Sequence, residues 1–350
     1  MHWRSLDTAI GYRAQAMATQ DRWIRGPAAD TAVAWCWVPF ALLAHGLEPH
    51  VGPLRQLLGA VLLFSFLHQP LTLALAYGSP ARLRRHRRVF LWSPVVLLVA
   101  VVAGTHVSLT ALAAVGGLWN AEHTLMQRFG VTRIYGRKGG DEQGGLEKPM
   151  LVSWLVFALI WVAADRRTPG LVARVGLDQV NASALGTLHH VAGPAKLLLL
   201  PAAAIVVMLV VRWLRAERAT VTRNPAKHSY LLSTAVLFAV ILIDPVAGFV
   251  AYVGAHAVEY FTVVHSALGR PPSRRGVLER TVARTGRTGF LAIYVGTIIG
   301  MLALLDRLTT PLEYTTTVLT LGGLHIFYDG FIWKLRQPAV ARTLAVPVAE

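Results

Sequence analysis

Histidine, carboxylate and amide side chains recur inside the apolar segments of this sequence. Ionisable groups are costly to bury in a membrane-spanning segment, and they usually mark functional sites there. Imidazole and carboxylate groups on facing helices bind divalent ions such as iron or manganese and leave coordination positions open for dioxygen. The polar residues in question are His68; Asn120, Glu122, His123 and Gln127; His256, Glu259 and His265; and His325 and Asp329.

The composition places these residues in a membrane protein. Of the 350 residues, 54% are hydrophobic and 15% are charged, and the mean hydropathy is +0.49, whereas soluble domains contain about 25% charged residues. The net charge of +16 would suggest a nucleic-acid partner in a soluble protein, but in a membrane protein it indicates basic cytoplasmic loops, so we expect no nucleic-acid partner. Cys36 is the single cysteine, which excludes an intramolecular disulfide and a cysteine-based metal site.

Hydropathy predicts an all-α, polytopic membrane bundle of about ten transmembrane helices. Alternating these spans across the membrane places 28 of the 34 Lys and Arg residues on one side, which predicts that both termini are cytoplasmic. We expect a cytoplasmic segment over 1–28, a transmembrane domain over 29–335 and a short cytoplasmic tail over 336–350, in the cytoplasmic (inner) membrane of a bacterium. The predicted spans are 29–46, 54–78, 89–106, 107–127, 149–164, 194–213, 229–244, 246–267, 288–305 and 314–333.

Four of these spans each carry a histidine in the half of the membrane that faces the cytoplasm. His256 and Glu259 are three residues apart, and His325 and Asp329 are four apart, so each pair shares a helix face. His265 follows His256 by nine residues, which places it on roughly the opposite face. The predicted metal ligands are His68, His123, His256, Glu259, His325 and Asp329, with both carboxylates acting as ligands or as acceptors behind them. Asn120 and Gln127 are expected to orient the ligands or dioxygen by hydrogen bonds.

Short segments around these histidines resemble the Brp/Blh β-carotene oxygenases, which are polytopic, iron-dependent membrane enzymes. The run from Gly323 to Asp329 resembles the last His-xxx-Asp motif of that family. The run from His256 to Phe261 is similar to its His-Ser-x-x-His-Phe element, with Tyr260 in place of the second histidine. His68 and His123 occupy the order of the two earlier motifs, without the His-Gly-x-x-Asp pattern. The resemblance implies a membrane-embedded non-haem iron enzyme that acts on a long apolar substrate.

The function expected from these features is a metal-dependent oxidoreductase, an oxygenase or a desaturase-like enzyme. It would use iron, as one ion or two, and dioxygen to act on a lipid or isoprenoid that enters from the bilayer. No flavin or nicotinamide motif is evident, so an oxygenation or desaturation would need a cytoplasmic electron donor docked on the basic loops. A zinc hydrolase is allowed by the same ligands. A proton-coupled transporter using the same groups, with breaks at Pro70, Pro201 and Pro245, and a haem cytochrome are the alternatives.

A second group of histidines falls on the outer side of the predicted membrane. These residues lie in or near loops, and we expect no carboxylate to pair with them at helical spacing, so they are weak candidates for a metal site. They are His45, His50, His106, His189 and His190.

Overall fold

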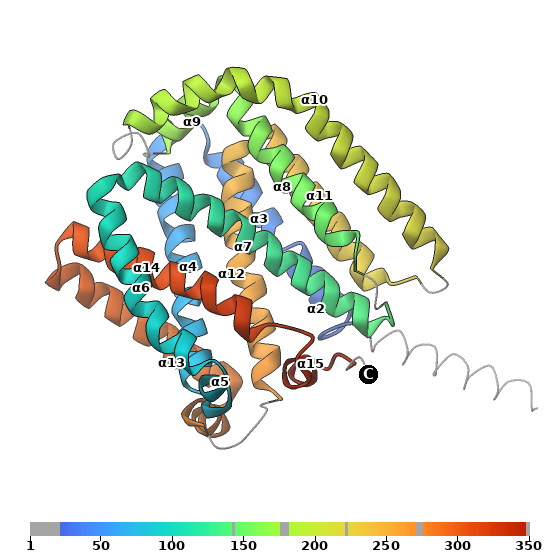
Figure 1. Ribbon diagram of the computed structural model, residues 1–350, viewed down its shortest axis with the longest axis vertical. Helices are drawn as coiled ribbons and strands as arrows, with labels where there is room; N and C mark the ends of the chain where they lie inside the picture. Colours follow the sequence, from blue (N-terminus) through green and yellow to red (C-terminus); the bar gives the residue numbers. More distant parts are fainter. Residues whose placement is uncertain (1–21, 142–143, 176–181, 221–222, 271–275, 348–350) are drawn as a thin grey trace, which may run out of the picture.

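The computed structural model describes residues 22–141, 144–175, 182–220, 223–270 and 276–347. The described residues form helices joined by short connections, with no β-strand among them (Figure 1). The helices are α2 Pro27–Ala34, α3 Trp37–Leu47, α4 Val51–Tyr77, α5 Pro80–Arg85, α6 Arg87–Val107, α7 Leu109–Lys138, α8 Glu147–Ala164, α9 Thr168–Arg174, α10 Ala182–Ala219, α11 Pro225–Ile243, α12 Pro245–Leu268, α13 Val277–Leu308, α14 Pro311–Ile332 and α15 Pro338–Thr343.

Side chains at the helix starts explain where the apolar stretches divide. The Ser108 side chain accepts a hydrogen bond from the backbone of Ala111 at the start of α7. Asp244 caps α12 in the same way, and Thr310 forms a capping box with Glu313 at the start of α14. Each cap satisfies backbone N–H groups that have no partner within the helix. The helix boundary at Asp244 lies where it was predicted, and the boundary at Ser108 lies within two residues of the predicted division between 106 and 107.

Eight of the described helical segments are long and apolar enough to cross a membrane. Exposed leucines such as Leu197 and Leu200, each 81% exposed on α10, are the side chains expected to face lipid. Helices α7 and α14 fall on the two remaining predicted spans but are not among these eight. They carry His123 and Gln127, and His325 and Asp329, respectively. The protein is thus a polytopic helical membrane protein, with candidate site residues on its two more polar long helices.

Several boundaries differ from the predicted ones. The first span is interrupted at Trp35 and Cys36, between α2 and α3, and α7 continues to Lys138 instead of ending near 127. Helix α13 begins at Val277, well before 288, and changes direction at Gly286, whose φ of +72° is a conformation that favours glycine. The added turns at the end of α7 and at the start of α13 are polar, and apolar runs alone therefore did not predict them.

Helix α12 lies at the centre of the bundle and packs against α3, α4 and α11 (Figure 1). Its contact with α3 is close at Gly254, where an added Cβ atom would lie 2.9 Å from the Phe40 ring, so only glycine fits there without a shift. Most of its other side chains are buried, including His256 and Glu259. The central position of α12 gives these two polar residues neighbours from several helices.

The carboxyl-terminal segment packs onto the bundle. Val340, Ala341 and Leu344 are buried in a cluster with Ile134 of α7 and Ala267 of α12. The segment predicted as a short tail over 336–350 therefore contributes to the core as far as Val346. The segment predicted over 1–28 lies mostly outside the described residues, and Trp23 in its described part is buried against α7 and α11.

Candidate metal centre

The four predicted histidines meet in the interior of the bundle. His68 of α4, His123 of α7, His256 of α12 and His325 of α14 are 0%, 7%, 1% and 0% exposed. The ring centroids of His68, His123 and His256 lie 4.7, 4.7 and 6.3 Å from that of His325. Four helices that are distant in the sequence therefore deliver one imidazole each to a single buried site.

The separations between Nε2 of His325 and two neighbouring ring nitrogens are each those of two ligands of one ion. The Nε2 atom of His325 lies 3.2 Å from Nε2 of His68 and 3.0 Å from Nε2 of His123. Nitrogen ligands placed about 2.0–2.1 Å from one ion, at octahedral to tetrahedral angles, lie about 2.8–3.4 Å apart. A ring nitrogen has one proton or one lone pair, so Nε2 of His325 cannot form good hydrogen bonds to both neighbours. A cation beside Nε2 of His325 would satisfy that nitrogen. The ligand atoms within 4.8 Å of one another form two groups that share His325, one with His68 and His256 and the other with His123 and Asp329.

His256 supports the same interpretation from the opposite side of the cluster. Its ring centroid is 4.6 Å from that of His68 and 5.1 Å from that of His123. Both of its ring nitrogens are buried without a hydrogen-bond partner, and a buried polar atom without a partner costs about 1–3 kcal/mol. His68, His256 and His325 each offer a nitrogen within 4.8 Å of the others. A metal would supply the missing partner for one nitrogen of His256.

Asp329 is the carboxylate that lies at the centre. Its Oδ2 atom is 3.7 Å from Nε2 of His123 and 3.9 Å from Nε2 of His325. Its Oδ1 atom accepts hydrogen bonds from Thr72 at 2.9 Å and Tyr260 at 3.1 Å. The hydroxyl groups therefore hold Oδ1, and Oδ2 faces the imidazoles. Carboxylate ligands of metals are commonly oriented by hydrogen bonds of this kind.

Thr72 also sets the orientation of His325. Its Oγ1 atom lies 2.7 Å from Nδ1 of His325. Because Thr72 donates its single hydroxyl proton to Asp329, it accepts from the Nδ1–H group of His325. That assignment leaves Nε2 of His325 with a lone pair directed at the cluster.

Replacing Thr72 with valine is expected to weaken metal affinity without removing a ligand. The change keeps the side-chain shape but deletes the hydrogen bonds to His325 and Asp329, and loss of such supporting contacts costs about 10–100-fold in metal affinity. Competition with a chelator of known affinity measures the change. Thr105→Val is a matched control, because its hydroxyl bonds only to a carbonyl of its own helix. Equal affinity in wild type and Thr72→Val would contradict this role.

Glu259 lies outside the imidazole cluster. Its Oε1 atom accepts a 2.7 Å hydrogen bond from Arg128 of α7, and the two side chains are 1% and 0% exposed. Among the described residues, no group with metal-ligand spacing includes Glu259. Glu259 accepts hydrogen bonds from Arg128 and Gln127, and neither of these is a predicted metal ligand. Arg128 directly follows the predicted span 107–127, but α7 continues past it to Lys138 and its side chain is buried in the bundle.

The two predicted amides differ in what they contact. Gln127 donates to the backbone carbonyl of His256 at 3.0 Å and to Glu259 at 3.4 Å, so it braces α12 near the cluster. Asn120 is half-buried one helical turn before His123. It makes no hydrogen bond to the four histidines within the described part of the chain. The structure thus brings Gln127, but not Asn120, into contact with the neighbourhood of the imidazoles.

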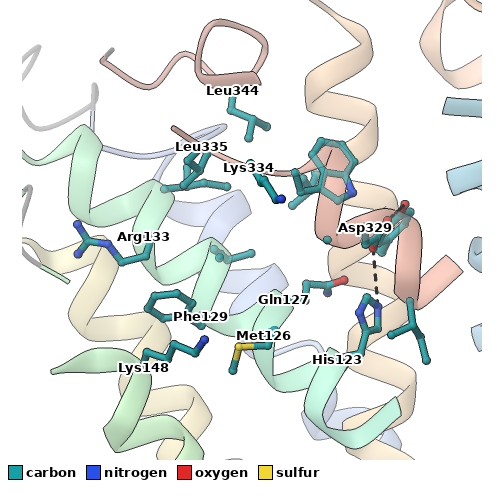
Figure 2. Close-up of a pocket in the computed structure, with 18 of the residues that line it drawn as sticks. His123, Met126, Gln127, Phe129, Arg133, Lys148, Asp329, Lys334, Leu335 and Leu344 are labelled. Atoms are coloured by element: carbon teal, nitrogen blue, oxygen red, sulfur yellow. Dashed lines mark hydrogen bonds and ion pairs between the residues drawn. The ribbon is translucent and has the colours of Figure 1, made fainter. Parts of the chain in front are cut away.

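A cavity of about 710 Å³ opens beside the cluster. Its lining includes His123, Gln127, Tyr260 and Asp329, together with Trp333 just after α14. Figure 2 shows His123 and Asp329 facing each other on one side of this cavity. The candidate site is therefore buried yet adjoins a space large enough for a small molecule.

The outer histidines do not assemble into one site. His50, His106 and His189 are exposed, and no metal-type group among the described residues contains them. The expectation that no carboxylate pairs with this group is wrong for His45. Its Nδ1 atom lies 2.8 Å from Asp244 and 4.0 Å from Glu48, three residues along α3. These contacts tie the end of α3 to the turn between α11 and α12.

Comparison with known proteins adds no assignment to this geometry. No protein-family model, curated protein or solved structure matches the chain. Its function is therefore inferred from the chemistry of the site.

Proposed function

We propose that this protein is a membrane-embedded, metal-dependent oxidoreductase whose metal is iron. The observation that carries the proposal is the position of the His325 Nε2 atom in the bundle interior, 3.2 Å from Nε2 of His68 and 3.0 Å from Nε2 of His123. His256 would be a further ligand and Asp329 the carboxylate ligand. A histidine-rich set with one carboxylate suits iron, whereas soft-metal sites use the thiolates that are missing here.

The remaining side chains would hold the ligands and keep water away. Iron in such a site activates dioxygen for attack on an unreactive carbon. Thr72 and Tyr260 fix Asp329, and Thr72 fixes the tautomer of His325. The apolar side chains around the site, with Phe66, Leu71 and Leu324 buried close by, would limit water entry and side reactions.

The proposed setting is the inner membrane of a bacterium, with ten spans and both termini in the cytoplasm. Helices α7 and α14 would cross the membrane because their polar side chains face other helices and not lipid: Arg128, His123 and His325 are all buried. The bilayer would supply a lipophilic substrate from the side. A cytoplasmic electron donor would dock on the basic loops.

Metal analysis of anaerobically purified protein, combined with electron paramagnetic resonance, tests this function. We expect near-stoichiometric iron and, after addition of nitric oxide, the signal of a non-haem ferrous site. Metal-free protein that moves a solute across vesicle membranes would replace the enzyme by a transporter. A Soret band would indicate haem, and stoichiometric zinc would indicate a hydrolase.

A further inference from the structure

The cavity beside the cluster runs along one face of α7. Lining residues recur at helical spacing from Trp119 through His123, Gly130 and Ile134 to Arg137, which is one side of a regular helix. His123 and Arg137 are fourteen residues apart on α7, so they lie about 21 Å apart along the helix axis. The cavity is therefore elongated, with the candidate metal centre at one end.

Charge is distributed unevenly along this cavity. The carboxylates in its lining, Glu122 and Asp329, lie at or beside the histidine end. The basic side chains in its lining are Arg133, Arg137, Lys148, Lys334 and Arg336, from α7, from the start of α8 and from the segment after α14. Figure 2 shows Arg133 and Lys148 away from the His123 and Asp329 pair. The cavity thus passes from an acidic, histidine-lined end to a basic end.

Most of these basic groups are not neutralised by carboxylates. Arg133 is paired with Glu147 at 2.9 Å and with Asp141 at 3.2 Å. In the described part of the chain, the other four make no ion pair. Arg137 donates to the carbonyl of Leu335, and the ammonium group of Lys334 lies 4.9 Å from the centroid of the Phe331 ring. The basic end therefore has positive charge available for a ligand.

The middle of the cavity is apolar. Met126 and Phe129 of α7, Val263 of α12 and Ile326 of α14 line it between the two ends. A hydrocarbon chain placed against these side chains would be removed from water, at a gain of roughly 0.8 kcal/mol per buried methylene.

We propose that this cavity binds an amphiphile with an anionic headgroup, which is the substrate class of the proposed oxidoreductase. The headgroup, a phosphate or carboxylate, would lie against Arg137, Lys334 and Lys148. The hydrocarbon chain would extend along α7 and present a carbon remote from the headgroup to the histidine end. This inference rests on the proposed function for its chemistry, but the binding itself depends only on the cavity.

A preference for basic residues on the cytoplasmic side does not by itself explain the arrangement. That preference places Lys and Arg on one side of the membrane, yet it does not gather residues from three separate segments around one cavity. Exposed basic residues elsewhere, such as Arg212 on α10, line no such space. A neutral hydrocarbon would leave the four cations of the basic end without an anionic partner.

Equilibrium binding of radiolabelled hexadecyl phosphate to the full chain in phosphatidylcholine nanodiscs tests the proposal. We expect hexadecyl phosphate to bind about tenfold more tightly than hexadecanol, since a charged hydrogen bond contributes about 1.5–3 kcal/mol. Lys148→Gln and Arg137→Gln should each remove most of that preference, and Arg212→Gln should retain it. Inorganic phosphate should not compete at equal concentration, because it lacks the chain.

Several results would overturn the proposal. They are equal binding of hexadecyl phosphate and hexadecanol, full competition by inorganic phosphate, and an equal loss in Arg212→Gln and Lys148→Gln. Lys148 is exposed, so its replacement tests the headgroup contact even if Arg137→Gln does not fold. The same titration in metal-free His325→Ala should keep the preference. A chain that binds no iron but prefers hexadecyl phosphate would refute only the proposed function, and the reverse result would refute only the headgroup assignment.

Discussion

Replacing His325 with alanine is expected to reduce bound metal to below one-tenth of the wild-type content. His325 is the histidine whose Nε2 atom faces both His68 and His123, at 3.2 and 3.0 Å, and its Nδ1 atom is held by Thr72. The substitution removes one proposed ligand, and it also removes the ring that lies beside both His68 and His123. Elemental analysis of detergent-purified protein, normalised to protein concentration, gives the metal content.

The matched control is His265→Ala. His265 lies on α12, nine residues after His256, and its ring nitrogens contact Arg25 and Thr288 and not the cluster. Its replacement removes the same atoms from a half-buried position and should leave the metal content unchanged. If His325→Ala retained wild-type metal, or if His265→Ala lost as much, the four imidazoles would not be the metal site. Near-infrared circular dichroism of the cobalt-substituted protein would show whether the ligand field changes in His256→Ala.

Replacing Arg128 with methionine is expected to destabilise the protein by about 3–5 kcal/mol. The Arg128 guanidinium is fully buried between Glu259 and Thr234. Its removal would leave the Glu259 carboxylate buried without an opposite charge, and breaking a buried pair on one side has a cost of this size. Chemical unfolding in mixed micelles, followed by circular dichroism, measures the free-energy difference. Arg215→Met, on the exposed end of α10, is the control for loss of an arginine.

The double variant Arg128→Met with Glu259→Leu separates the pair from the packing around it. Because no unpaired charge remains, we expect it to recover most of the stability lost in Arg128→Met. It should also retain metal, since Glu259 is not placed among the imidazoles. If the double variant lost its metal while remaining folded, Glu259 would be a ligand after all. If the double variant were less stable than both single variants, the two side chains would contribute independently of each other.

Much of the architecture and of the site follows from the residue pattern. Each predicted span falls on a helix, or for the first on a pair of helices, because continuous apolar runs of this length are specific to membrane helices. The meeting of His68, His123, His256 and His325 could be predicted, since their similar distances from the basic loops favour one common level on four helices. Asp329 could be assigned from its four-residue spacing to His325.

Other contacts depend on which side chains face each other across helices. Arg128 follows Gln127 at the predicted end of a span, where a basic residue is usually a cytoplasmic flank. Its partner Glu259 is 131 positions away, and no local spacing links the two. Thr72 stands four residues after His68, at the position of the Asp in the His-Gly-x-x-Asp pattern that is absent here, and this spacing was its one signal in the sequence. The polar turns that lengthen α7 and α13 have no apolar pattern, so hydropathy did not include them.

The order in which the helices leave the ribosome constrains when this centre can form. His68 lies on α4, in the first quarter of the chain, whereas His325 and Asp329 lie on α14, close to its end. The other three imidazoles therefore lack their common neighbour His325 until α14 has been synthesised. A chain that stops before residue 311 would contain His68, His123 and His256 but not His325. Metal loading would then require that the chain has been synthesised and inserted through α14.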